Sequence, residues 1–304
     1  MSEPEAHQFH DSYVAANGVR LHCVTAGEGP LIVFLHGFPE FWYEWKNQLK
    51  EFGADHLAVA PDLPGYNLSD KPRGLESYQV TELVEGLRAL ADHFRGGKPF
   101  ILVGHDWGGA LAWAFAIAHP ESLHRLIIIN APHFAIFRRL LASDPDQQRA
   151  SQYMLLFRSP QAEAMLSADH YKLLVDAMMG DLLRTGAFTP ADKQAYLTAW
   201  GQPGALTGGL NYYRANGVGP PIPSAMEAEI VQSNATPADP AAMVVRVPTL
   251  VIWGEKDTAL TIKNLEGLDQ FVPQLTIKRI PDGSHWVIHE KPAEVNGYIR
   301  EFIG

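Results

Sequence analysis

The chain has 304 residues, of which 46% are hydrophobic, and its formal net charge is −10. This length and apolar content suffice for a sizeable core, whereas the acidic balance leaves no basic face for nucleic acid or anionic lipid. Cys23 is the single cysteine, which excludes an internal disulfide and leads us to expect a reducing, cytoplasmic location.

The N-terminal segment 1–18 is acidic and polar, and no apolar run in the chain is long enough to span a membrane. We therefore expect no secretory signal and no membrane association. Residues 13–16 and 20–25 flank Asn17-Gly18. Because Asn-Gly is a strong signal for a tight turn between antiparallel strands, the sequence predicts a hairpin here.

Six short aliphatic runs follow, each bounded by Gly, Pro or Asp, as expected for strands that are buried on both faces. They lie at 31–35, 56–60, 100–103, 126–129, 250–253 and 275–280. Amphipathic helical patterns lie between them, for example at 77–94 and 110–118. This alternation predicts an α/β fold in which a mostly parallel sheet is covered by helices on both faces.

The alternation stops after Pro132 and resumes at Val247. The residues between them show no convincing strand, but helical patterns at 150–157, 160–168, 171–184 and 190–201, and Gly/Pro-rich stretches at 216–223 and 236–240. We therefore predict an α/β core of residues 1–132 and 246–304, interrupted by an all-helical cap of residues 133–245. Such a cap would lie over the carboxyl ends of the strands, where open α/β sheets bind ligands.

A glycine-rich segment, GHDWGG at 104–109, follows the strand predicted at 100–103 and precedes a predicted helix. Small residues two positions on either side of Asp106 allow a sharp turn that exposes its side chain. This is the pattern of a nucleophile elbow with Asp in the usual place of Ser. An Asp that merely caps a helix would have the same local sequence. We identify Asp106 as the candidate nucleophile.

Two later segments place polar side chains after the last two predicted strands. WGEKD puts Asp257 after 250–253, and GSHW puts His285 after 275–280. The order nucleophile, acid, histidine matches a triad in which His285 is the base and Asp257 holds its ring in the required tautomer. One histidine among 13 is commonly a surface or core residue, but here three roles occur at three strand ends in the required order.

The segment HGFPE at 36–40 follows the strand predicted at 31–35. Its position suits the backbone N–H of Phe38 as one donor of an oxyanion hole. The second donor would be the N–H of Trp107, directly after the candidate nucleophile. A purely structural turn also fits this segment.

The segments HGFPEFWYEW, PDLPGY, GHDWGG, WGEKD and SHW, in this order and spacing, resemble the epoxide hydrolase branch of the α/β-hydrolases over nearly the whole chain. The resemblance implies an α/β-hydrolase core with a helical cap. It extends to two cap segments, 152–157 and 210–216, with Tyr212 in the place of the family's tryptophan. By that match Tyr153 and Tyr213 polarise the epoxide oxygen, although packing is the ordinary role of an isolated helical tyrosine. We expect the substrate site to include Phe38, Trp107, Tyr153, Tyr213 and Trp286.

An aspartate nucleophile favours attack at a saturated carbon. Attack on an acyl carbon would give a reactive anhydride, whereas attack on a saturated carbon gives an alkyl ester that water activated by His285 can hydrolyse. The leaving group can be an epoxide oxygen or a halide. An epoxide oxygen leaves as an alkoxide and needs a proton donor such as a tyrosine, whereas a halide needs N–H donors.

Dehalogenation is the alternative reaction for the same nucleophile. Haloalkane dehalogenases usually have Asn or Trp where Phe38 stands, and fluoroacetate dehalogenases have Arg where Trp107 stands, so both positions weigh against it. Some α/β-hydrolase folds serve as small-molecule receptors, and a degraded triad would support that function here. The triad in this sequence is complete, which weighs against a receptor. Asn67 and Ser284 also depart from the family, which often has glycine at both positions, but neither is a catalytic side chain.

We therefore predict an epoxide hydrolase that opens a small-molecule epoxide to a vicinal diol through an alkyl ester on Asp106. No cofactor is expected, and no metal site, because the histidines form no H-x-x-x-H or Cys/His cluster. We expect no nucleic acid or membrane partner, and a monomer or homodimer.

Overall fold

The computed structural model of the protein describes residues 9–221 and 240–304. Residues 1–8 of the N-terminal segment, in which no secretory signal is expected, and parts of the predicted Gly/Pro-rich stretches (222–223 and 236–239) lie outside these ranges. In the part of the chain that is described, no helix is both long enough and apolar enough to cross a membrane.

One eight-stranded sheet forms the centre of the molecule, in the order β1-β2-β4-β3-β5-β6-β7-β8. The strands are β1 His10–Ala16, β2 Val19–Ala26, β3 Leu31–Leu35, β4 Leu57–Pro61, β5 Phe100–His105, β6 Leu123–Ile129, β7 Thr249–Gly254 and β8 Leu275–Ile280. β2 pairs antiparallel with β1 and β4, and the other neighbours are parallel. In the turn between β1 and β2, Asn17 and Gly18 both have positive φ, so the predicted hairpin is confirmed.

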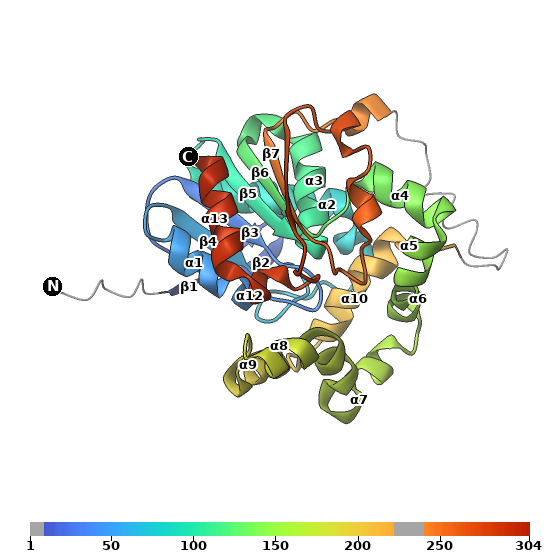
Figure 1. Cartoon of the computed structure of the whole chain (residues 1–304). Coiled ribbons are helices and arrows are strands. Elements are labelled where there is room, and N and C mark those ends of the chain that lie inside the picture. The colour runs from blue at the N-terminus through green and yellow to red at the C-terminus, as the bar shows by residue number, and fades with distance from the viewer. Residues whose placement is uncertain (1–8, 222–239) are drawn as a thin grey trace.

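Side chains of the buried strands alternate between two apolar clusters, one on each face of the sheet. On β3, Leu31, Val33 and Leu35 join the first cluster, and Ile32 and Phe34 join the second. Helices α2 (Val80–Arg95) and α3 (Asp106–Ala118) cover the first face, and α1 (Lys46–Phe52) and α13 (Pro292–Ile303) cover the second (Figure 1). The predicted α/β fold with helices on both faces is therefore confirmed.

The other helices outside α1, α2, α3, α13 and the larger helices between β6 and β7 are short. They are the α-helix α12 (Val287–Glu290) and the 3-10 helices Trp42–Trp45, Leu75–Tyr78, Pro120–Ser122, Pro240–Met243, Ile262–Leu265 and Leu268–Gln270.

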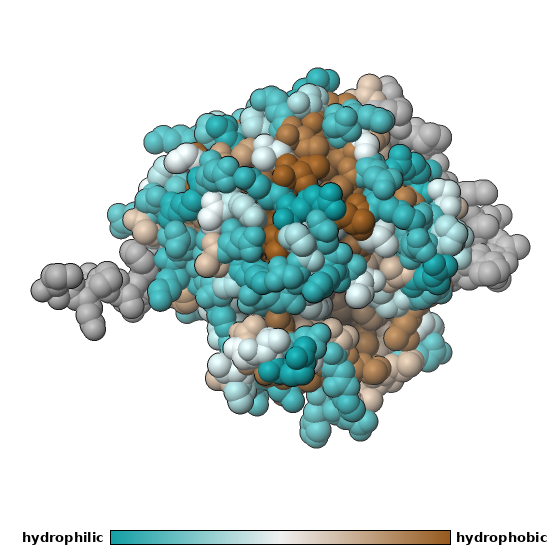
Figure 2. All heavy atoms as spheres, in the orientation of Figure 1, coloured by the Kyte–Doolittle hydropathy of each residue, from teal (hydrophilic) through white to brown (hydrophobic). Residues whose placement is uncertain are grey.

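The segment between β6 and β7 is helical and contains no strand among its described residues. Its members, called the cap helices below, are α4 Phe134–Ser143, α5 Pro145–Ala150, α6 Tyr153–Arg158, α7 Ala162–Leu174, the π-helix Val175–Met179, α8 Gly180–Thr185, α9 Pro190–Trp200 and α10 Ala205–Asn216. They lie together at one end of the sheet (Figure 1), and apolar residues are visible along their boundary with the core (Figure 2). The division of the chain after residues 132 and 245 stays a prediction.

Three cap helices were not predicted: α4 and α10 lie outside the predicted helical ranges, as does α5 except for its last residue. Two adjacent glycines lower the helix propensity of the α10 segment, and one of them, Gly208, is required by a tertiary contact. A Cβ at Gly208 would lie 2.3 Å from the carbonyl oxygen of Gly65 in the core. The packing of α10 against the core therefore stabilises a helix that its local sequence disfavours.

Candidate active site

Asp106 lies at the sharp turn between β5 and α3 and has a φ of 48°, which is uncommon outside glycine. The glycines around it allow strand, turn and helix to approach closely. A Cβ at Gly104 would lie 2.4 Å from the carbonyl oxygen of Gly108, and a Cβ at Gly108 would lie 2.0 Å from the carbonyl oxygen of Leu35. The local conformation is thus that of a nucleophile elbow, with a carboxylate at its tip.

One carboxylate oxygen of Asp106 faces the loop after β3. Its Oδ1 accepts a hydrogen bond of 2.9 Å from the backbone N–H of Phe38. Gly37 leaves room for this approach, since a Cβ there would lie 2.4 Å from the Cβ of Asp106. The other oxygen, Oδ2, lies 3.6 Å from Nε2 of His285. Asp106 therefore lies between a backbone donor and an imidazole.

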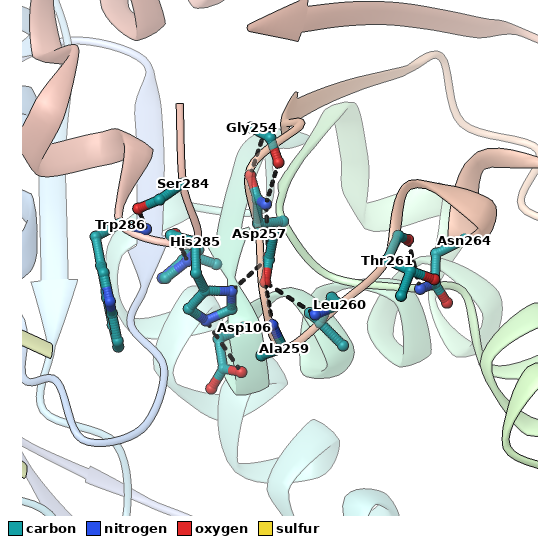
Figure 3. A network of polar contacts seen from close by, with 12 residues as sticks. Asp106, Gly254, Asp257, Ala259, Leu260, Thr261, Asn264, Ser284, His285 and Trp286 are labelled. Carbon is teal, nitrogen blue, oxygen red and sulfur yellow. Dashed lines mark hydrogen bonds and ion pairs between the residues drawn. The ribbon is translucent and has the colours of Figure 1, made fainter. Parts of the chain in front are cut away.

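The opposite side of the His285 ring contacts Asp257, as Figure 3 shows. Nδ1 of His285 donates to Oδ2 of Asp257 at 2.7 Å. The backbone N–H groups of Ala259 and Leu260 donate to Oδ1 at 2.8 Å each, and Nδ2 of Asn130 donates to Oδ2 at 2.7 Å. Three donors besides His285 thus hold the Asp257 carboxylate in one orientation, and the carboxylate in turn holds the His285 ring. The structure brings together the three residues expected from the sequence.

The charges of these groups depend on one another. Burial raises the pKa of Asp106, but the hydrogen bond and positive charge of His285 outweigh it and hold that pKa below its ordinary value. Burial lowers the pKa of His285, but the carboxylates of Asp257 and Asp106 outweigh it and hold that pKa well above its ordinary value. The resting site therefore contains an imidazolium between two carboxylates.

A cavity of about 370 Å³ opens over Asp106 and His285. Tyr153 on α6 and Tyr213 on α10 line it from the cap helices, with their ring centroids 6.5 Å apart. Burial, followed by the negative charge of Asp106, raises the pKa of both phenols well above the ordinary value, so both stay protonated. The cavity thus combines one carboxylate with two phenolic O–H donors.

The remaining lining of this cavity is mostly apolar, and it includes Phe38, Pro39, Leu156, Phe157, Leu166, Leu174, Met178 and Trp286. Trp107 instead borders a smaller cavity of about 70 Å³ that also reaches Asp106 and Tyr213. The Trp107 and Tyr213 rings pack edge to face, with their centroids 5.2 Å apart. Of the five residues expected at the substrate site, four therefore line the larger cavity and Trp107 lines the smaller one.

Asn130 is a site residue that the sequence analysis missed. It follows β6 directly with a φ of 39°, and its Oδ1 accepts from the backbone N–H of Gly254 at 2.8 Å. With its bond to Asp257, it joins the carboxyl ends of β6 and β7. The sequence places Asn130 directly after the strand predicted at 126–129. Because polar side chains at the carboxyl ends of parallel strands gather at one edge of the sheet, this position could have identified Asn130 as a site residue.

Both departures from the family pattern have a local explanation. Asn67 has a φ of 36°, a conformation that favours glycine, and its Nδ2 donates to Oδ2 of Asp62 at 2.8 Å. Ser284 donates from Oγ to Glu290 at 2.7 Å and accepts from the backbone N–H of Trp286 at 3.1 Å. Asparagine tolerates the positive φ, and the serine orders the loop that carries the histidine.

A buried polar cluster close to the site was also missed. Ligand-type atoms of Glu40, Glu44 and His289 all lie within 4.8 Å of one another. Glu40 accepts from Tyr196 O–H and from His289 Nε2, the latter at 2.8 Å, and Glu44 accepts from the backbone N–H of Gly37 at 3.3 Å. All three side chains therefore have partners within the protein, and we assign no metal to them.

Comparison with known proteins agrees with this geometry. Residues 30–292 match the family model of the alpha/beta hydrolase fold. The AB hydrolase superfamily protein YfhM of Bacillus subtilis is 41% identical over 96% of this chain and 96% of its own. Epoxide hydrolase 4 of Mus musculus is 36% identical over 94% of this chain and 77% of its own.

Among solved structures, a mutant epoxide hydrolase from Bacillus megaterium, complexed with its product, a naphthyloxy-propane-1,2-diol, superposes with a TM-score of 0.86. It is 35% identical, and the match covers 96% of this chain and 99% of that one. The chain therefore belongs to the alpha/beta hydrolase fold family and groups there with the epoxide hydrolases, as its sequence motifs predicted.

Proposed function

We propose that this protein is an epoxide hydrolase that converts an epoxide to a vicinal diol through an alkyl ester on Asp106. The observation that carries the proposal is the pairing, in one cavity, of a carboxylate nucleophile and two phenolic donors, Tyr153 and Tyr213. The diol bound by the Bacillus megaterium relative supports the same reaction class.

In the first step, Oδ2 of Asp106 attacks a ring carbon of the epoxide and the carbon–oxygen bond of the ring opens. Oδ1 keeps its hydrogen bond from Phe38, which leaves Oδ2 to attack. Tyr153 and Tyr213 donate hydrogen bonds to the epoxide oxygen, and one of them transfers its proton to the developing alkoxide. Even with a raised pKa a phenol can do so, because an alkoxide is a far stronger base than a phenolate.

In the second step, water attacks the carbonyl carbon of the Asp106 ester. Esterification has removed the negative charge of Asp106, so the pKa of His285 falls and the imidazolium gives its proton, through solvent, to the tyrosinate left by ring opening. The neutral His285 ring then accepts a proton from the attacking water. Asp257 stabilises the imidazolium that forms. The N–H of Phe38, and by our assignment that of Trp107, stabilise the negative charge on the ester oxygen. As the ester carbon–oxygen bond breaks, His285 gives its proton to the departing alkoxide and the diol leaves. Asp106 is left as a carboxylic acid and returns a proton to His285, which restores the resting site.

Dehalogenation with the same nucleophile remains the alternative, and the two reactions differ in their need for the tyrosines. The apolar cavity supports a small, largely hydrophobic substrate. The proposed chemistry uses no cofactor. We also propose a cytoplasmic location, on the ground that the chain has a single cysteine, the buried Cys23, and therefore no internal disulfide.

Two measurements test the proposal. Purified protein is first offered aryl and alkyl epoxides, haloalkanes and fluoroacetate, and we expect turnover of epoxides to diols. A single turnover in ¹⁸O-water with enzyme in excess should then place heavy oxygen in Asp106, detected by mass spectrometry of its peptide. Heavy oxygen that enters the diol directly would contradict the ester intermediate, and turnover of haloalkanes alone would contradict the epoxide assignment.

A further inference from the structure

Glu44 is a buried carboxyl group that the reaction above does not use, and it connects two parts of the site. It lies in the 3-10 helix Trp42–Trp45, and its side chain has no exposed surface. Its Oε2 accepts from the backbone N–H of Gly37, directly before the Phe38 donor. Its Oε1 lies 2.5 Å from Nδ1 of His105, and neither atom forms a hydrogen bond of regular geometry with any described residue, so this close contact is the interaction to be explained.

The other nitrogen of His105 determines where the hydrogen between Glu44 and His105 resides. Nε2 of His105 lies 2.9 Å from the backbone carbonyl oxygen of His285. A carbonyl oxygen only accepts hydrogen bonds, so Nε2 carries a hydrogen. Burial, together with the positive charge of His285, lowers the pKa of His105 to about 4, so at neutral pH its Nδ1 has a lone pair. The hydrogen in the 2.5 Å contact then belongs to Oε1 of Glu44.

The surroundings of Glu44 favour this neutral form. Burial and the nearby carboxylate of Glu40 raise the pKa of Glu44 well above its ordinary value. Asp106 adds to the negative field, and His289 opposes it. Both oxygens of Glu40 accept hydrogen bonds, from Tyr196 and from His289.

We propose that Glu44 is a protonated positioning residue that holds the Phe38 donor loop through Gly37 and the catalytic base through His105 and the carbonyl of His285. The proposal rests on the function proposed above and extends it. Ordinary carboxylate–histidine pairs are charged; this one is a neutral acid that donates to a neutral imidazole. The close approach of the elbow glycines to their neighbours holds the backbone of Asp106 independently of Glu44.

The two ends of this connection act in the same chemical step. The N–H of Phe38 stabilises the charge on the ester carbonyl, and His285 activates water, so both act directly in ester hydrolysis. In ring opening the N–H of Phe38 only orients Asp106. Loss of Glu44 should therefore slow hydrolysis more than alkylation. The alkyl enzyme would accumulate, so kcat and KM should fall together while kcat/KM changes little, whereas a general loosening of the site would lower kcat/KM.

The kinetic experiment compares Glu44→Gln, Glu44→Leu and the exposed control Glu76→Gln, with styrene oxide as the probe. A glutamine amide can donate to Nδ1 of His105 and accept from Gly37, so we expect Glu44→Gln to hydrolyse the ester within about twofold of wild type. Glu44→Leu can do neither, and we expect its hydrolysis rate to fall about tenfold or more through misplacement of the base. A glutamine variant as slow as the leucine variant would overturn the proposal, as would an equal loss in kcat/KM.

A second measurement does not depend on activity or on the leucine variant folding. In protein labelled with ¹⁵N-histidine, the His105 signals, identified by their loss in His105→Gln, should report a neutral ring with hydrogen on Nε2 between pH 6 and 8. Glu44→Gln should preserve that pattern. A doubly protonated His105 ring in wild type would overturn the proposal. If wild type opens no epoxide, the function is wrong, and this spectrum still decides the state of Glu44.

Discussion

His285 contacts two carboxylates, and its role depends on losing the charge of one of them. Asp257 and Asp106 together raise its pKa well above the ordinary value of 6.5 despite burial. In the resting protein, the imidazolium keeps Asp106 ionised and ready to attack. The raised pKa means that His285 binds its proton more tightly in the folded state than in the unfolded state. The stabilisation that His285 contributes in this way is fully present below pH 6.5 and is lost as the pH rises through the raised pKa.

Replacement of the base should separate the two chemical steps. We expect His285→Gln to be alkylated on Asp106 but to hydrolyse the ester about 100-fold to 10,000-fold more slowly, because no group remains to take the proton of water. Mass spectrometry after exposure to an epoxide should show a lasting adduct on the Asp106 peptide. Normal turnover by this variant would mean that His285 is not the base.

The pH dependence of hydrolysis provides an independent check on the charge argument. Because the ester carries no charge, His285 should have a lower pKa in the alkyl enzyme than in the resting protein. The rate of ester hydrolysis should rise with pH and level off at a lower pH than that at which resting His285 loses its proton. Stopped-flow measurement of hydrolysis and ¹⁵N NMR titration of the resting protein give the two values, which would coincide if the Asp106 charge had no influence.

Tyr153 and Tyr213 distinguish epoxide opening from dehalogenation. A Tyr→Phe change keeps the ring and removes the O–H, so each single variant should lose part of the alkylation rate. The double variant should lose at least about 100-fold, because no donor remains for the alkoxide. Pre-steady-state alkylation measures this loss. A double variant within a few-fold of wild type would contradict the epoxide hydrolase assignment.

At the level of elements, the elbow depends on how closely α3 approaches β3. Gly108→Ala would place a Cβ 2.0 Å from the carbonyl oxygen of Leu35, which is backbone and cannot move aside cheaply. We expect the free energy of unfolding to fall by about 2 to 3 kcal/mol or more, and activity to fall with it, because Asp106 is displaced.

Gly86 on α2 provides the matched control for this change. A Cβ there would meet nothing within 4 Å, so Gly86→Ala should raise the free energy of unfolding by roughly 0.5 to 1 kcal/mol. Urea unfolding of both variants gives the comparison. Equal changes in the free energy of unfolding for the two variants would show that close packing at Gly108 does not determine the conformation of the elbow.

At the level of the whole molecule, cap helix α9 contacts the loop and helix that follow the Phe38 donor. Trp200 donates from Nε1 to the carbonyl oxygen of Pro39 at 2.6 Å. Asp192 accepts from Tyr43 O–H at 2.9 Å and forms an ion pair with Lys46. The cap and the oxyanion-hole loop should therefore be stabilised together.

The ion pair of Asp192 tests this coupling. Asp192→Asn should lower the free energy of unfolding by about 1 to 3 kcal/mol, the range for hydrogen bonds to charged groups. Lys46, Thr189 and Tyr43 outweigh burial and hold the pKa of Asp192 below its ordinary value, so its contribution is present at neutral pH and is lost as the pH falls through that lowered pKa. The difference from wild type should shrink in acid.

The control for this variant is Asp181→Asn, which breaks an exposed pair with Arg184 on α8. Such pairs contribute little, so urea unfolding should show a change of roughly 0.5 kcal/mol or less. An equal loss in both variants would mean that the contact between α9 and the core adds no stability of its own.

The sequence alone predicted the parts of this protein that depend on near neighbours. Strand cores, the Asn17-Gly18 hairpin and the glycines around Asp106 follow from local apolar runs and from backbone conformations that few residues adopt. The placement of Asp106, Asp257 and His285 at the ends of three predicted strands predicted their meeting, because parallel strands bring their carboxyl ends to one edge of the sheet.

Only the tertiary structure decided the contacts between distant segments. Asn130 reaches Asp257 across 127 positions of the chain, and Glu44 meets His105 beneath the elbow. Helix α10 forms although its glycines lower its helix propensity, because Gly208 packs closely against Gly65 in the core. Buried polar pairs and close backbone approaches depend on which segments the fold brings together, and that information lies in no single stretch of sequence.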